Sequence, residues 1–184
     1  AQLGGHQFDY IVHAAGATKC LHSYDFFRTN TNGTVNFVKA IHALQMPVEK
    51  FVYLSSFSIF GSIKEEQPYQ EITDQDTPKP NTYYGKSKLI AEKRLKDLAG
   101  TMPYVILRPT GVYGPREKDY FLMAKSIKGH TDFAVGYQQQ DITFVYVKDV
   151  VQAVFLSLTK GENGKAYFLS DGKVYQSSTF SNLI

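Results

Sequence analysis

The sequence predicts an α/β chain with a doubly wound parallel sheet, because short apolar runs alternate with long helical patterns. The runs lie at 9–14, 50–55 and 104–108, and each is a nearly continuous stretch of hydrophobic residues. Strands of this kind suit a parallel sheet with helices on both faces, since neither side of the strand meets water. The order strand–helix–strand–helix–strand therefore indicates consecutive βαβ units.

Two long helical patterns separate these strands. The first runs from about 23 to 45 and stops near Pro47, and the second runs from about 82 to 99 and stops at Gly100. Proline and glycine at these places are typical helix boundaries. A polar loop at 62–81 precedes the second helix and is long enough to suggest a function such as a lid.

The chain after Arg108 is less regular. Residues 109–115 form a turn-like stretch that is rich in glycine and proline. Beyond it, the pattern predicts four further elements: a short helix at 120–128, a strand at 142–147, a helix at 149–159 and a strand at 165–169.

Composition and charge exclude several classes of protein. The net charge is +3, and the basic residues are scattered, without the basic stripe that is typical of nucleic-acid binding. No apolar run approaches the ~20 residues that span a bilayer. The five histidines have no cysteine partners at metal-ligand spacing, so no metal is expected. The single cysteine, Cys20, excludes an internal disulfide, fits a reducing compartment and suggests a cytoplasmic protein.

One face of the second helix combines apolar and reactive side chains. Helical spacing places five residues on this face: Tyr84, Lys88, Ala91, Leu95 and Leu98. A lysine on an otherwise apolar face needs a partner, and Tyr84 lies one turn before it. A neighbouring ammonium favours the phenolate, so we expect a lowered Tyr84 pKa and a usable acid or base. The alternative is an ordinary amphipathic helix in which Lys88 extends to solvent and Tyr84 belongs to the core.

Six further segments stand out along the chain: Asp9–Ala17, Asn30–Thr34, Phe51–Gly61, Tyr83–Lys88, Leu107–Arg116 and Phe144–Val150. In this order they resemble motifs of the extended short-chain dehydrogenase/reductase family, which includes the NAD-dependent epimerases and dehydratases. A single short motif occurs by chance, whereas six motifs in family order are a strong signal.

The resemblance implies a fold and a set of site residues. The fold would be a partial doubly wound, Rossmann-like sheet: residues 1–108 would be the C-terminal part of the dinucleotide-binding domain. Residues 109–184 would be mostly substrate lobe, with 142–160 returning to the core. The implied catalytic residues are Ser56, Tyr84, Lys88 and Asn30.

The implied cofactor is NAD or NADP, and the substrate is a small molecule. The residues expected at the cofactor are His13, Ala14, Ala15, Gly16, Leu54, Ser55, Tyr84, Lys88, Pro109 and Val112. Those expected at the substrate are Ser56, Tyr84, Thr110 and Arg116.

Simpler roles are open for several of these residues. Ser55 and Ser58 are alternatives to Ser56, whose hydroxyl could merely satisfy a backbone group at the strand end. The Asn30 amide could form a plain helix–sheet hydrogen bond, and the stretch 14–16 could be only a tight turn.

The sequence departs from the family in lacking the motif Gly-x-x-Gly-x-x-Gly, whose backbone N–H groups hold the pyrophosphate. We therefore expect a fragment without the first half of the sheet, inactive by itself and with little affinity for NAD(P). The strand at 10–14 would then be an exposed edge with a tendency to pair. We expect self-association through this edge or through the two long helices.

A second departure concerns the substrate. Ile142 stands where nucleotide-sugar enzymes of the family carry an arginine for the diphosphate, and an apolar side chain cannot pair with phosphate. Arg116 is an alternative phosphate ligand. The stretch 108–116 also resembles the steroid-dehydrogenase and flavonol-reductase-like branch. The rival from another class is a non-catalytic dinucleotide-binding sensor or scaffold.

Overall fold

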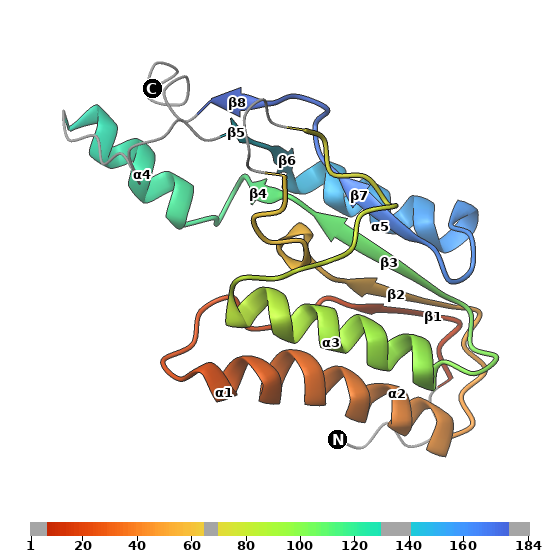
Figure 1. Ribbon diagram of the computed structural model, residues 1–184. Helices are drawn as coiled ribbons and strands as arrows, with labels where there is room; N and C mark the ends of the chain where they lie inside the picture. The colour runs from red at the N-terminus through yellow and green to blue at the C-terminus, as the bar shows by residue number, and fades with distance from the viewer. Residues whose placement is uncertain (1–6, 65–69, 130–140, 177–184) are drawn as a thin grey trace. The chain divides into compact units, whose positions relative to one another are not determined.

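A four-stranded sheet is the centre of the first part of the chain (Figure 1). The computed structural model describes residues 7–64, 70–129 and 141–176. The sheet contains β1 (Tyr10–His13), β2 (Lys50–Leu54), β3 (Tyr104–Pro109) and β7 (Ala166–Leu169), in the order β1-β2-β3-β7. β1 and β2 pair in parallel, as do β2 and β3. The prediction of an α/β chain with a parallel sheet is confirmed.

The first long helix is not uniform along its length. It consists of α1 (Ser23–Phe26), a π-helical segment (Phe27–Asn32) and α2 (Gly33–Ala43). The predicted span of 23–45 is therefore close to the observed one, 23–43. Its central segment is a π-helix, which is wider than an α-helix. Such π-helical turns are rare and occur often at functional sites.

The second long helix, α3 (Tyr83–Leu98), begins at a side-chain cap. The Thr82 hydroxyl accepts a hydrogen bond from the Gly85 backbone N–H at 3.0 Å, which satisfies one of the free donors at the helix start. The loop before α3 includes 65–69, which lie outside the described residues, so the suggested lid at 62–81 stays a prediction.

The core lies between the sheet and the pair α2 and α3, which run side by side across one face (Figure 1). Sheet and helices both contribute fully buried side chains to this cluster: Phe51, Tyr53, Ile106, Val38, Ile41, Ala91 and Leu95. On the opposite face, Gly161 at the end of α5 (Val147–Lys160) lies against Val105, where a Cβ would approach the valine side chain to 2.8 Å. The two faces of the sheet are thus covered by different elements.

The chain folds into two compact units, 1–108 with 154–168 and 109–153 with 169–184. The second unit contains α4 (Asp119–Lys128) and two small sheets. β4 (Gly111–Tyr113) pairs in parallel with β6 (Phe144–Tyr146). β5 (Asp141–Ile142) pairs antiparallel with β8 (Tyr175–Gln176).

Two predictions for this second unit were wrong in detail. The expected single strand at 142–147 is two strands separated by Thr143, because Ile142 pairs with Tyr175 whereas Phe144 pairs with Gly111 in another sheet. Part of the turn-like stretch 109–115 is the strand β4, which only its pairing with β6 reveals.

β1 lies at one edge of the sheet among the described strands. Tyr10 and Val12 are 47% and 43% exposed, whereas Ile11 and His13 are 9% and 8% exposed. Within the described residues, no helix combines the length and apolar character that a membrane crossing requires. The same residues contain no cluster of acidic, histidine or cysteine side chains suited to a metal ion.

Candidate active site

Lys88 lies inside the first unit and does not extend to solvent. Lys88 is 4% exposed, and its Nζ donates a hydrogen bond to the Leu54 carbonyl at 2.6 Å. The same nitrogen lies 4.7 Å from the centre of the Tyr53 ring, a cation–π contact. Burial lowers the pKa of Lys88 to about 8, against the opposing effect of the Glu92 carboxylate. The lysine is thus held at the end of β2 by a carbonyl and an aromatic face.

Tyr84 is half-buried one turn earlier on α3. Its pKa is raised by burial, while a hydrogen bond with Ser56 acts in the opposite direction. We expected Lys88 to lower the pKa of Tyr84, and this prediction was wrong. Desolvation of the phenolate raises the pKa and outweighs the other effects. At neutral pH the Tyr84 phenol is protonated and is a proton donor.

The serine that contacts Tyr84 is Ser56, at the point where β2 ends. Its Oγ accepts a hydrogen bond from the Ser58 backbone N–H and donates one to Ser58 Oγ, both at 3.1 Å. The simpler backbone-capping role is therefore present, and it holds the hydroxyl beside the Tyr84 phenol. The neighbouring Ser55 hydroxyl is buried and has no hydrogen-bond partner among the described residues.

Asn30 lies in the π-helical segment and joins three parts of the first unit. Its Oδ1 accepts from the Ala17 N–H at 2.7 Å, and its Nδ2 donates to the Ala17 carbonyl and to Ser87 Oγ, each at 3.0 Å. The next residue, Thr31, donates from Oγ1 to the Ser87 carbonyl at 2.8 Å. The side chain of Asn30 thus positions the loop after β1 against α3.

The loop after β1 passes close to Lys88. A Cβ at Gly16 would lie 3.1 Å from Asn30 Oδ1 and 3.5 Å from Lys88 Nζ. Ala14, Ala15 and Gly16 are all exposed. Small residues here keep the space above the lysine amine free of side chains.

His13 ends β1 in a neutral form. Thr34 Oγ1 donates to the Asn30 carbonyl at 2.7 Å, so it accepts the 2.9 Å hydrogen bond from His13 Nε2. The ring stacks on Tyr53 with 5.6 Å between ring centroids. Burial first, and the Lys88 charge second, lower the pKa of His13 to about 4.

The remaining predicted residues belong to the second unit. Pro109 ends β3, Val112 lies in β4, and Thr110 donates from its hydroxyl to the Leu169 carbonyl at 3.1 Å. Arg116 is exposed and has a positive φ of 76°. Their roles at cofactor and substrate stay predictions.

Sequence reasoning missed the polar residues that support the site. Ser87 joins α3 to Asn30 and Thr31, and Glu92 forms a buried ion pair with Arg108 at 2.7 Å. The spacing of Glu92, four residues after Lys88, is a signal that places both on one helix face.

The parallel sheet, with Tyr84 and Lys88 on one helix and Ser56 beside the tyrosine, defines the class of extended short-chain dehydrogenases/reductases. Residues 2–170 match the model of the NAD dependent epimerase/dehydratase family. The chain belongs to this family.

Relatives of known name agree with this assignment. Mouse dTDP-D-glucose 4,6-dehydratase is 31% identical over 172 residues, which cover 88% of this chain and 46% of the relative. Short-chain dehydrogenase/reductase family 42E member 1 of Macaca fascicularis is 31% identical over 78% of this chain and 41% of its own length. The solved structure of RMD from Pseudomonas aeruginosa complexed with NADPH superposes with a TM-score of 0.79. It is 26% identical and covers 95% of this chain and 64% of that one. The chain thus spans about half the length of the curated relatives it matches.

Proposed function

We propose that this chain carries the acid–base groups of an NAD(P)-dependent oxidoreductase that acts on an alcohol or carbonyl of a nucleotide sugar. The observation that carries the proposal is the arrangement of Tyr84, Ser56 and Lys88 at the end of β2. The Ser56 hydroxyl lies beside a protonated tyrosine, and a buried lysine lies one turn further along α3. This set is more than a passive binder of dinucleotides needs.

The proton-transfer step follows from these protonation states. Tyr84 Oη gives its proton to the carbonyl oxygen of the substrate while Ser56 donates a hydrogen bond to the same oxygen. When bound, a reduced nicotinamide supplies the hydride that converts the carbonyl carbon into an alcohol carbon. Lys88 stabilises the tyrosinate that the transfer leaves behind, and solvent returns the proton to Tyr84.

Two features of the first unit fit a bound dinucleotide. The Ser55 hydroxyl is buried without a hydrogen-bond partner among the described residues, so it has a free donor. Small residues leave space above the Lys88 amine, where a ribose hydroxyl would accept a hydrogen bond. We expect His13, Ala14, Ala15 and Leu54, which lie at or directly after the ends of β1 and β2, to contact the same cofactor.

The proposed substrate class rests on the relatives, of which one is named for a dTDP-sugar. Ile142 cannot bind a diphosphate, so Arg116 is the proposed cation for that group. Turnover of a steroid or flavonol-type alcohol instead of a nucleotide sugar would favour the other branch of the family.

The test is the Tyr84→Phe variant of the protein that carries this chain, assayed with NAD(P) and a panel of nucleotide sugars. We expect turnover to fall by about a thousandfold, because general acid–base catalysis contributes roughly that much. Tyr83→Phe is the matched control, since Tyr83 is 56% exposed on the same helix. Equal rates in the two variants would refute the role of Tyr84, and cofactor binding without any turnover would favour a sensor or scaffold.

We expect the chain alone to bind NAD(P) weakly, because the sequence has no Gly-x-x-Gly-x-x-Gly turn for the pyrophosphate. Titration calorimetry of this chain with NAD and with NADPH measures the affinity directly. A dissociation constant in the micromolar range would contradict the expectation.

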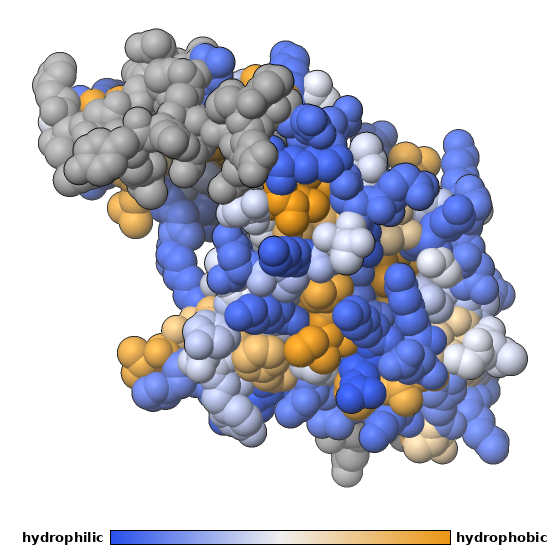
Figure 2. All heavy atoms as spheres, in the orientation of Figure 1, coloured by the Kyte–Doolittle hydropathy of each residue, from blue (hydrophilic) through white to orange (hydrophobic). Residues whose placement is uncertain are grey.

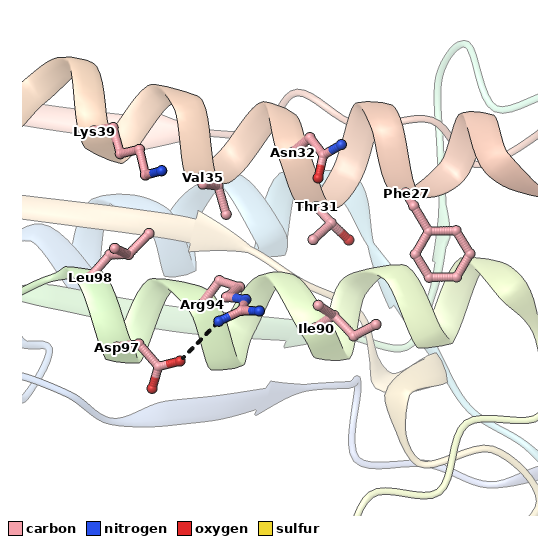
Figure 3. A pocket seen from close by; sticks show the side chains of 9 residues that line it. All are labelled: Phe27, Thr31, Asn32, Val35, Lys39, Ile90, Arg94, Asp97 and Leu98. Carbon is pink, nitrogen blue, oxygen red and sulfur yellow. Dashed lines mark ion pairs between the residues drawn. The ribbon is translucent and has the colours of Figure 1, made fainter.

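We also propose that copies of this chain associate with one another. α3 and the helix that ends in α2 enclose a groove of about 460 Å³ (Figure 3). Apolar side chains from both helices line it, and ionic ones border it: Phe27, Thr31, Asn32, Val35, Lys39, Ile90, Arg94, Asp97 and Leu98. Figure 2 shows apolar atoms between polar ones on this face. A face with both signs of charge around apolar residues suits pairing with a second copy.

The edge strand β1 is the second candidate surface for this association, since Tyr10 and Val12 are exposed on it. Light scattering at increasing concentration distinguishes the two surfaces. Ile90→Glu should abolish association through the helices, and Val12→Lys should abolish association through the edge. A monomer at all concentrations in the unsubstituted chain would refute both.

A further inference from the structure

A buried ion pair lies next to Lys88, and the proposed chemistry does not use it. Glu92 is 1% exposed and Arg108 is 8% exposed. The two side chains form a fork: Arg108 Nε donates to Glu92 Oε1 at 3.1 Å, and Nη2 donates to Oε2 at 2.7 Å. The guanidinium lies 5.5 Å from the Phe60 ring and 5.8 Å from the Phe168 ring. Rings and carboxylate together hold Arg108 in one orientation.

Stability alone does not account for this pair. Removing two charges from water costs about as much as their attraction returns, so apolar residues of the same size would serve a core equally well. A buried carboxylate is therefore best explained by a neighbour on which its charge acts.

That neighbour is Lys88. Tyr84, Lys88 and Glu92 follow one another at intervals of four on the sheet-facing side of α3. The titratable groups that act on the lysine amine or contact it are His13 from β1, Tyr53 from β2 and Glu92 from α3 itself, with Arg108 of β3 beyond Glu92. Among these described groups, Glu92 is the one acidic side chain, and it is ion-paired with Arg108.

We propose that Glu92, fixed in place by Arg108, is a positioning residue that keeps Lys88 positively charged and its amine directed at the Leu54 carbonyl. Its relevance to catalysis rests on the function proposed above, but its electrostatic effect on Lys88 does not. Without the carboxylate, Lys88 would have only neutral neighbours and the Arg108 cation, and its buried ammonium would lose its proton more readily. A neutral Lys88 would no longer stabilise a tyrosinate at Tyr84.

The test measures the pKa of Lys88 directly, by NMR titration of the chain labelled with ¹³C at the lysine Cε. The Lys88 signal is the one that disappears in Lys88→Met. We expect Glu92→Gln to lower the Lys88 pKa by about one unit, because a nearby opposite charge shifts a pKa by that order. The double variant Glu92→Gln/Arg108→Met should show a smaller fall, since the unpaired Arg108 cation is then also gone.

Asp97→Asn is the matched control. It removes a carboxylate from the same helix, but the Asp97 side chain is 65% exposed and pairs weakly with Arg94 at 3.9 Å (Figure 3). We expect no shift of the Lys88 pKa in this variant. An unchanged Lys88 pKa in either folded Glu92 variant, or an equal shift in Asp97→Asn, would overturn the proposal. If Glu92→Gln does not fold, the double variant decides the question, because it removes the Arg108 cation together with its carboxylate partner.

This result is separable from the proposed reaction. A shifted Lys88 pKa in a protein without turnover would retain the electrostatic role and refute only the catalytic one. Turnover that depends on Tyr84, combined with an unshifted Lys88 pKa, would refute the role of Glu92 alone.

Discussion

The two faces of the sheet differ in how exposed their side chains are, and the difference is clear at the edge strand β1. On β1, Ile11 and His13 face α2 and α3 and are at most 9% exposed, whereas Tyr10 and Val12 alternate with them and are more than 40% exposed. On the opposite face, α5 contributes Leu156, which is 47% exposed. Along β1, one face is thus a covered core and the other presents apolar side chains to solvent, whereas Val52 and Val105 on that second face of β2 and β3 are fully buried.

The candidate site lies on the face that α2 and α3 cover. His13, Tyr53 and Lys88 are all buried, and all three belong to the first unit. The environment that lowers the pKa of Lys88 therefore needs no residue from the opposite face. Substitutions on the covered face should therefore change the free energy of unfolding more than substitutions at exposed positions of the opposite face.

The largest expected effect comes from a core truncation on the covered face. Leu95→Ala should destabilise the chain by about 3 kcal/mol, because it leaves a cavity in a close-packed cluster. Leu156→Ala, the matched change on the opposite face, should cost less than about 0.5 kcal/mol. Urea unfolding followed by circular dichroism measures both. Equal losses would mean that the opposite face is as well packed as the first.

A second effect concerns acid stability. The pKa of His13 is about 4 in the folded chain and near 6.5 when unfolded, so between these values the unfolded state binds a proton that the folded state does not. This contribution to stability is fully present above pH 6.5 and is lost as the pH falls to 4. The loss is on the order of 2 kcal/mol once solvent screening is considered.

Unfolding free energies of His13→Gln between pH 7 and pH 4 should therefore fall less steeply than those of the unsubstituted chain. His42→Gln is the control, because His42 is exposed at the end of α2 and bonds the Leu98 carbonyl at 2.9 Å. A slope in His13→Gln that matches the control would show that His13 does not titrate as its burial indicates.

The smallest effect is expected on the exposed side of β1. Val12→Lys should change the free energy of unfolding by no more than about 0.5 kcal/mol, since its side chain already meets water. Ile11→Ala, one residue away on the buried side, should cost about 2 kcal/mol. Thermal unfolding at low concentration, where copies do not associate, distinguishes the two. A large loss in Val12→Lys would show that this side of the strand is covered in solution.

Much of the architecture was predictable because its signals are local. The three strands stand out as apolar runs, and α3 is bounded by Thr82 and Gly100. The helical stripe that places Tyr84 and Lys88 on one face is a matter of spacing, and burial of Lys88 in the structure agrees with it. The family motifs located Ser56, which lies beside Tyr84.

Other features depend on partners distant in the sequence. The division of the expected strand at 142–147 follows from two different pairing strands, and neither is local. The raised pKa of Tyr84 is a balance between burial and one hydrogen bond, which residue identity alone does not determine. The Glu92–Arg108 pair joins residues 16 apart on a helix and a strand.

The sequence by itself determined the order of strands and helices, the family, and the row of reactive residues along α3, because periodicity and motif spacing are properties of neighbouring residues. Only the tertiary structure decided the protonation states of these side chains along α3. A pKa depends on which groups the fold brings around a side chain and on how much water it removes, and these are set by packing between elements. For this protein the decisive cases are a protonated Tyr84, a buried Lys88 and the carboxylate of Glu92 beside it.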